Sequence, residues 1–143
     1  LTRNKKLYKN FTNQDTFSDR LVLLLFHFAF FLNVFKSSSK KETLQEIFDY
    51  TFNQLELSIR EMGYGDASIN KKMKNYVNIF YAILNKIENW DLIDENKKDK
   101  IVCDYLDLDA KSSLFSNYFN NYRNYLKKNT FNSIIKGVIK PNF

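Results

Sequence analysis

Apolar residues are densest near the start of the chain, where they form its least polar stretch. From Leu21 to Leu32 only His27 interrupts the run, which ends at Asn33. The spacing predicts a helix from Phe17 or Ser18 to about Lys36. A membrane-spanning helix needs about 20 apolar residues, and this run is shorter. We therefore expect a buried helix at the centre of the fold.

Two longer stretches repeat their apolar residues with the period of an amphipathic helix. Residues 43–62 carry one stripe, made of Leu44, Ile47, Phe48, Phe52, Leu55, Ile59 and Met62. The stretch from Ser68 to about Glu88 carries another, made of Ile69, Met73, Tyr76, Val77, Phe80, Leu84 and Ile87. These two helices and the first one are predicted to form the heart of the fold.

The rest of the chain predicts a turn around Trp90 over residues 89–94 and shorter helices over residues 95–108, 111–128 and 130–140. In the second of these, one stripe consists of Phe115, Phe119, Tyr122 and Leu126. Three glycines and one proline in 143 residues are too few for a turn-rich β-sandwich, and no hairpin signal is present. The prediction is an all-α, single-domain helical bundle of about five to six helices over residues 16–143, with a central apolar helix near residues 18–36. A loose, basic segment is expected over residues 1–15.

A glycine-containing corner joins the second and third predicted helices. Gly63 stands where a helix ending at Met62 needs a residue that tolerates positive φ, and Gly65 lets the chain turn again. Asp66 or Ser68 is expected to cap the next helix.

Three lysines follow this corner at once, namely Lys71, Lys72 and Lys74. Because cations oppose the helix dipole in a first turn, their presence favours a surface for an acidic partner. The alternative is a tight turn between helices with solvated lysines.

Several motifs surround this corner in a fixed order: an early apolar helix from Asp19 to His27, the segment Ile47–Asp49 leading to Leu57–Gly63, the corner Gly65–Ser68, the turn Lys71–Lys74 and the pair Phe80–Tyr81. In order, spacing and residue type, residues from about Phe17 to Tyr81 resemble the ubiquinol-cytochrome c chaperone family, the assembly factors for cytochrome b of the respiratory bc1 complex. The family tends to follow its Phe-Tyr pair with a glycine and a basic residue, whereas Ala82 and Ile83 stand here.

The resemblance implies a non-catalytic chaperone that binds newly made cytochrome b and shields it until haem insertion and complex assembly proceed. In mitochondrial relatives this occurs near the ribosomal exit with a small second partner. The resemblance implies no cofactor.

Charge is concentrated at both ends of the chain. Residues 1–41 hold 8 basic and 2 acidic groups, and residues 111–143 hold 6 basic and no acidic groups, while the whole chain carries +6. Such ends could steer the protein towards an anionic membrane, ribosomal RNA or an acidic partner. A basic helical domain that binds RNA or the ribosome is therefore the alternative function; DNA is not an expected partner.

Candidate catalytic residues are few. One histidine and one cysteine cannot supply the clustered ligands of a zinc site. His27 lies between Phe26 and Phe28, so we expect a core histidine with one local hydrogen bond. Cys103 is expected to be a buried small hydrophobe rather than a nucleophile. No catalytic or metal site is predicted, although an enzyme acting through either residue is a third hypothesis.

Aromatic residues make up 17% of the sequence. Tyr118 and Tyr125 flank the stripe of the 111–128 helix, and they could line an apolar groove for a client helix or stack on RNA bases. With Tyr81 and the three corner lysines they are the predicted partner-binding residues.

The chain begins at Leu1 rather than methionine, so it carries no information on a targeting segment. We expect the bacterial cytoplasm, at the inner face of the inner membrane, with the mitochondrial matrix or inner membrane as the alternative.

Overall fold

The computed structural model describes residues 16–37, 40–106 and 114–136, and within them the chain is helical without strands. The helices are α2 (Phe17–Phe35), α3 (Lys41–Glu61), α4 (Asp66–Lys86), the short 3-10 helix η1 (Trp90–Leu92), α5 (Glu95–Leu106), α6 (Leu114–Lys128) and α7 (Phe131–Ile135). The all-α prediction is confirmed. The expected loose segment over residues 1–15 lies outside the described residues.

Helix α2 is the central helix, as its sequence predicts. It begins with a capping box, in which the Asp19 N–H donates to Thr16 Oγ1 and the Thr16 N–H donates to the Asp19 carboxylate, both at 3.2 Å. Twelve of its nineteen residues are buried. By length and composition alone α2 could cross a membrane. The shortness of its apolar run therefore does not by itself distinguish a core helix from a membrane-spanning one. Its burial among the other helices identifies it as a core helix.

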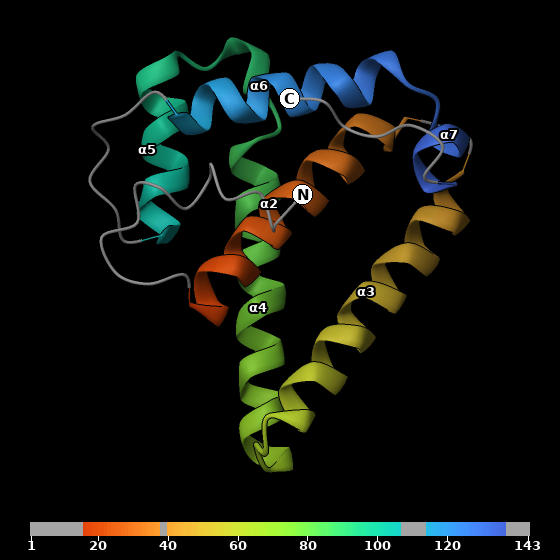
Figure 1. Ribbon diagram of the computed structural model, residues 1–143, viewed down its shortest axis with the longest axis vertical. Helices are drawn as coiled ribbons and strands as arrows, with labels where there is room; N and C mark the ends of the chain where they lie inside the picture. The colour runs from red at the N-terminus through yellow and green to blue at the C-terminus, as the bar shows by residue number, and fades with distance from the viewer. Residues whose placement is uncertain (1–15, 38–39, 107–113, 137–143) are drawn as a thin grey trace.

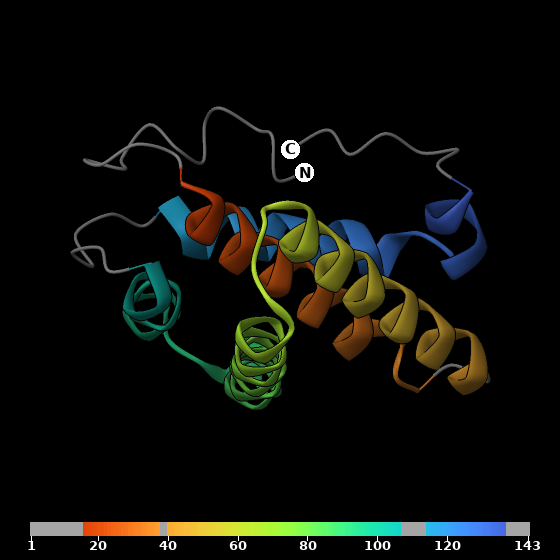
Figure 2. The same ribbon diagram turned by 90° about the horizontal axis from the view of Figure 1, so that it is seen from below.

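The other helices are arranged around α2. Helix α2 contacts both α4 and α6. Helices α3 and α4 meet at the corner that joins them and move apart with distance from it (Figure 1). The view from below shows α4 almost end-on beneath α2 and α6 (Figure 2). Aromatic rings fill the space between the helices, for example Phe30 against Phe119 at 5.1 Å between centroids. Each such pair adds to the stability that burial of apolar area provides.

The C-terminal helices complete the core. The predicted stripe of α6 is confirmed, since Phe115, Phe119, Tyr122 and Leu126 are all buried. Helix α7 covers the end of α2 through Phe131, whose ring lies 5.4 Å from that of Phe35. The expected helix over residues 130–140 is shorter, because α7 ends at Ile135; residues 137–143 are outside the described part.

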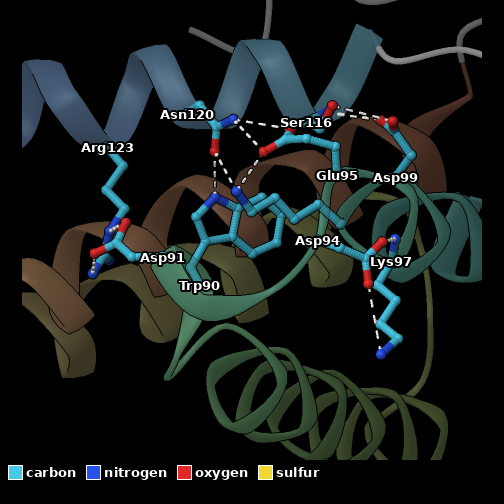
Figure 3. A network of polar contacts seen from close by, with 10 residues as sticks. Trp90, Asp91, Asp94, Glu95, Lys97, Asp99, Ser116, Asn120 and Arg123 are labelled. Atoms are coloured by element: carbon cyan, nitrogen blue, oxygen red, sulfur yellow. Dashed lines mark hydrogen bonds and ion pairs between the residues drawn. The ribbon is translucent and has the colours of Figure 1, made fainter.

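Hydrogen bonds attach α5 and α6 to the rest of the fold (Figure 3). Arg123 on α6 pairs with Asp91 through two 3.1 Å contacts and also donates to Asn33 Oδ1 on α2 at 2.7 Å. Hydrogen bonds from Lys127 and Arg123 hold the pKa of Asp91 below its usual value. Asp99 on α5 accepts from the backbone N–H of Ser116 at 2.8 Å, so a carboxylate from a neighbouring helix satisfies an N-terminal amide of α6.

Three local expectations are wrong. Met62 was expected in the buried stripe of α3 but is 48% exposed, because α3 ends before it. Ile83 was left out of the expected stripe of α4 but is fully buried. Neither Asp66 nor Ser68 caps α4: Gly65 occupies the N-cap position with no side-chain cap bond. Asp66 is the first helical residue, and its carboxylate pairs with Arg60 at the end of α3 instead.

Candidate functional site

An open groove of about 410 Å³ lies where the end of α2, the first half of α3 and the second half of α4 come together. Its lining consists of Leu32, Asn33, Lys36, Lys41, Leu44, Gln45, Phe48, Phe80, Tyr81, Leu84, Asn85 and Glu88. Apolar side chains form the larger part of its surface, with polar groups among them. This combination is typical of sites that bind a mostly apolar ligand and orient it with a few polar contacts.

The floor of the groove rests on packed aromatic rings. Phe48 lies 6.3 Å from Phe28 and 5.6 Å from Phe80 between ring centroids, so three helices contribute to one cluster. Tyr81 lies at the edge of this cluster, 6.1 Å from Phe48, and is 50% exposed. The structure therefore places the predicted binding residue Tyr81 in the groove.

The rim of the groove carries charged and amide groups. Lys36 Nζ lies 3.3 Å from Glu88 Oε1 and joins the C-cap of α2 to the second residue beyond α4, with both side chains more than half exposed. Lys41, at the start of α3, also lines the groove and is exposed. Asn33 is buried and fixed by its hydrogen bond from Arg123. Exposed ion pairs contribute little to stability, so Lys36 and Glu88 are available to rearrange around a ligand.

The corner lysines lie in the first half of α4 and do not line the groove. Lys71 and Lys74 are exposed, and Lys72 is half-buried with its Nζ 4.4 Å from the centre of the Tyr64 ring. At about 1.5 Å of rise per residue, Phe80 lies roughly 14 Å from Lys71 and roughly 9 Å from Lys74 along α4. The three lysines are therefore separated from Tyr81 by two to three turns of the same helix.

The two tyrosines expected on the surface of α6 lie differently. Tyr118 is 9% exposed, and its hydroxyl lies 2.8 Å from His27 Nε2, so the expectation that it faces a partner is wrong. Tyr125 is half-buried, packed against the core. Helix α6 turns more of its surface towards α2 and α5 than its main stripe indicates, which is why Tyr118 belongs to the core.

His27 is a core histidine, as predicted. Its Nδ1 lies 2.6 Å from the carbonyl oxygen of Leu23, which can only accept, so Nδ1 carries the proton. Nε2 then accepts from Tyr118. Burial lowers the pKa of His27 to about 4, partly offset by the hydrogen bond to Leu23. The imidazole is neutral and enclosed at physiological pH.

Cys103 is buried as expected, with 2% of its surface exposed. Within the described ranges, no group of three or more His, Cys, Asp or Glu side chains is placed to hold a metal ion.

A family model described as ubiquinol-cytochrome C chaperone matches residues 9–91. The chain belongs to the ubiquinol-cytochrome c chaperone family. The match extends beyond the residues from about 17 to 81 on which the sequence resemblance rests. No curated protein and no solved structure matches the chain. Membership points to a non-enzymatic assembly factor with a protein partner in assembly of the bc1 complex, at the membrane.

Every residue that lines the groove falls inside the part of the chain that matches the chaperone family. The sequence did not reveal the groove, because Leu44, Phe48, Phe80 and Leu84 have the same helical spacing as ordinary core residues. Where α3 diverges from α4, Phe48 and Leu84 are partly exposed and Tyr81 is half exposed, whereas Leu44 and Phe80 are buried. One sequence motif does lie in the groove, namely the Phe80–Tyr81 pair of the family resemblance.

Proposed function

We propose that this chaperone binds newly made cytochrome b through the groove between α2, α3 and α4, and holds it until the bc1 complex assembles. The observation that carries the proposal is that the apolar groove lies wholly within the family-matching residues. An apolar segment of an unassembled membrane protein needs such a surface, because its own apolar face is otherwise exposed to water.

The groove fits temporary binding. A volume of about 410 Å³ accepts a few apolar side chains rather than a whole helix. Amphipathic or apolar helices are commonly recognised by seating a few anchor residues in a groove of this kind. A small contact of this size releases its client when the client finds its permanent partners.

Tyr81 is the residue on which the test depends. It is half exposed at the groove, and large aromatic residues at the centre of a contact often dominate binding energy. We expect Tyr81→Asp to weaken binding of cytochrome b at least tenfold, because the client would then desolvate a charge. Tyr50 supplies the matched control, since it is 67% exposed on α3 and does not line the groove.

The measurement is site-specific photocrosslinking from position 81 and from position 50, together with accumulation of the bc1 complex in cells that carry only Tyr81→Asp or only Tyr50→Asp. Crosslinks to cytochrome b from position 81 and loss of the complex with Tyr81→Asp alone would support the proposal. Equal crosslinking from both positions, or normal assembly with a stably folded Tyr81→Asp protein, would contradict it.

The place of action follows from the client. We propose that the protein works beside the membrane into which cytochrome b is inserted, on the cytoplasmic face in a bacterium or on the matrix face in a mitochondrion. The basic residues gathered over 1–41 and 111–143 support contact with the ribosome or with a small second assembly factor.

Of the two tyrosines expected to stack on RNA bases, Tyr118 is buried against His27 and Tyr125 is half-buried against the core. Stacking on bases requires exposed aromatic faces, so the RNA-binding alternative loses support. We therefore retain the chaperone as the proposed function.

A further inference from the structure

The corner between α3 and α4 forms a projecting tip with an unusual surface. It stands at one end of the long axis of the molecule, away from α5, α6 and α7 (Figure 1). Two large side chains there remain in solvent, with Met62 48% exposed and Tyr64 43% exposed. A fold that leaves such side chains on a projection gains nothing in core stability from them.

Positive charge surrounds this apolar tip. Residues 60–74 hold four basic groups and two acidic ones. Arg60 is engaged by Glu56 and Asp66, with contacts that raise its pKa. Among the described residues no ion pair involves Lys71 or Lys74, so their charges face solvent, and the remaining acidic group of the tip is Glu61.

Lys71 and Lys74 are set back along α4 from the exposed side chains of the tip. Counting along α4 from Asp66, Lys71 and Lys74 are roughly 8 and 12 Å from the tip. Amphipathic segments that lie on a membrane bury their apolar side chains about 5–10 Å into the boundary between headgroups and acyl chains. With Met62 and Tyr64 at that depth, the lysines would lie level with the phosphates.

We propose that this tip docks the protein on an anionic lipid surface. Met62 and Tyr64 enter the interface, where tyrosine is favoured because its ring is apolar and its hydroxyl is polar. Lys71 and Lys74 contact the lipid phosphates, and Lys72, whose Nζ lies 4.4 Å from the centre of the Tyr64 ring, adds its charge beside the inserting tyrosine. The pairing of an exposed methionine with the lysines favours lipid over RNA, since a thioether contributes nothing to phosphate or base recognition. Docked in this way, the protein would hold the groove roughly 20 Å from the tip, along α4.

Each lysine near an anionic surface contributes about 1 kcal/mol, which is roughly fivefold in partitioning. Three lysines with two apolar side chains give reversible rather than permanent attachment. The inference is independent of the groove, because none of the residues it uses lines the groove.

The test is co-sedimentation of the full chain with vesicles of phosphatidylcholine alone or mixed with phosphatidylglycerol. We expect binding to the anionic vesicles only. Changing Lys71, Lys72 and Lys74 together to Gln should lower partitioning at least tenfold, and the Met62→Ser, Tyr64→Ser double variant should lower it severalfold.

A control variant removes the same charge elsewhere. Lys97, Lys100 and Lys128 are exposed on α5 and α6, and their joint change to Gln should leave partitioning within about twofold, since these residues lie outside the tip. A loss equal to that of the corner variant would show attraction by net charge alone and would overturn the proposal. So would absence of vesicle binding, or binding of RNA through the same three lysines without binding of vesicles.

A fluorescent residue reports on insertion directly. Trp90 is fully buried, so Tyr64→Trp adds one exposed indole against a constant background. Anionic vesicles should shift its emission to the blue, and lipids brominated on their acyl chains should quench it. Sedimentation with the vesicles but no shift and no quenching would overturn insertion of the tip.

Discussion

At the scale of single residues, the hydrogen bonds of His27 determine how the core responds to pH. The side chain is 3% exposed and lies between the Leu23 carbonyl and the Tyr118 hydroxyl. Tyr122 packs against the same ring at 4.9 Å, and burial raises the pKa of this tyrosine above its usual value. A proton on Nε2 would therefore meet a buried environment in which none of the described residues that contact the ring, Leu23, Tyr118, Phe119 and Tyr122, is a carboxylate.

This environment predicts that the free energy of unfolding falls as the solution is acidified. The pKa of His27 falls from 6.5 to about 4 on folding, so below pH 6.5 the unfolded chain binds a proton that the folded chain rejects. Stability contributed by the neutral ring is complete above pH 6.5. Between pH 6.5 and 4 it is lost at up to about 1.4 kcal/mol per pH unit.

The measurement is urea unfolding of the parent and of His27→Gln between about pH 7 and pH 5. The variant should be less stable at neutral pH, because it repacks the core, but its stability should fall less on acidification. Parallel pH profiles for the two proteins would show that His27 titrates as an exposed residue does.

At the scale of the elements, the corner between α3 and α4 depends on one glycine more than the other. Gly63 has φ +88°, whereas Gly65 has φ −73° at the N-cap of α4. A Cβ atom at either position would meet no other atom within 4 Å. The two positions therefore differ in backbone conformation rather than in space.

The same substitution at both positions separates these effects. Gly63→Ser should destabilise the protein by about 1 kcal/mol, because the left-handed region strains a residue with Cβ. Gly65→Ser should be neutral or stabilise by a few tenths of a kcal/mol, since serine can cap α4 where Gly65 provides no side-chain bond. Chemical denaturation of both variants tests this, and equal midpoints would rule out the proposed role of Gly63.

At the scale of the whole molecule, the helices outside the family match share a core with those inside it. Trp90 lies 4.9 Å from Phe30 on α2 between ring centroids, and its Nε1–H donates to Asn120 on α6 at 2.8 Å. Arg123 connects α6 to both Asp91 and Asn33. These contacts predict that residues 16–143 unfold as one domain.

The prediction can be tested with two probes. Thermal unfolding followed by Trp90 fluorescence and by far-ultraviolet circular dichroism should give coincident transitions, as expected for a single domain of this size. Arg123→Met should lower both midpoints by the same amount. Separate transitions, with the fluorescence change first, would show that α5 and α6 form an independent unit.

The sequence alone determined the helical character of the chain and most of its core. The periods of Leu44 to Ile59 and of Phe115 to Leu126 arise from burial of one face of a helix, and they depend on few details of the neighbours. The resemblance of residues from about Phe17 to Tyr81 gave the family, and within that stretch the positive φ at Gly63 restricts which residues can stand at the corner.

Tertiary structure decided which apolar side chains are enclosed and which form a surface. Spacing cannot distinguish Phe119, which packs on Phe30, from Leu84, which lines an open groove, because both repeat with the same helical period. Nor can it show that Asp66 bonds to Arg60 rather than capping α4, or that Tyr118 meets His27 across 91 residues of sequence. Each of these outcomes depends on where a second helix lies, and that position is determined by packing of the whole chain.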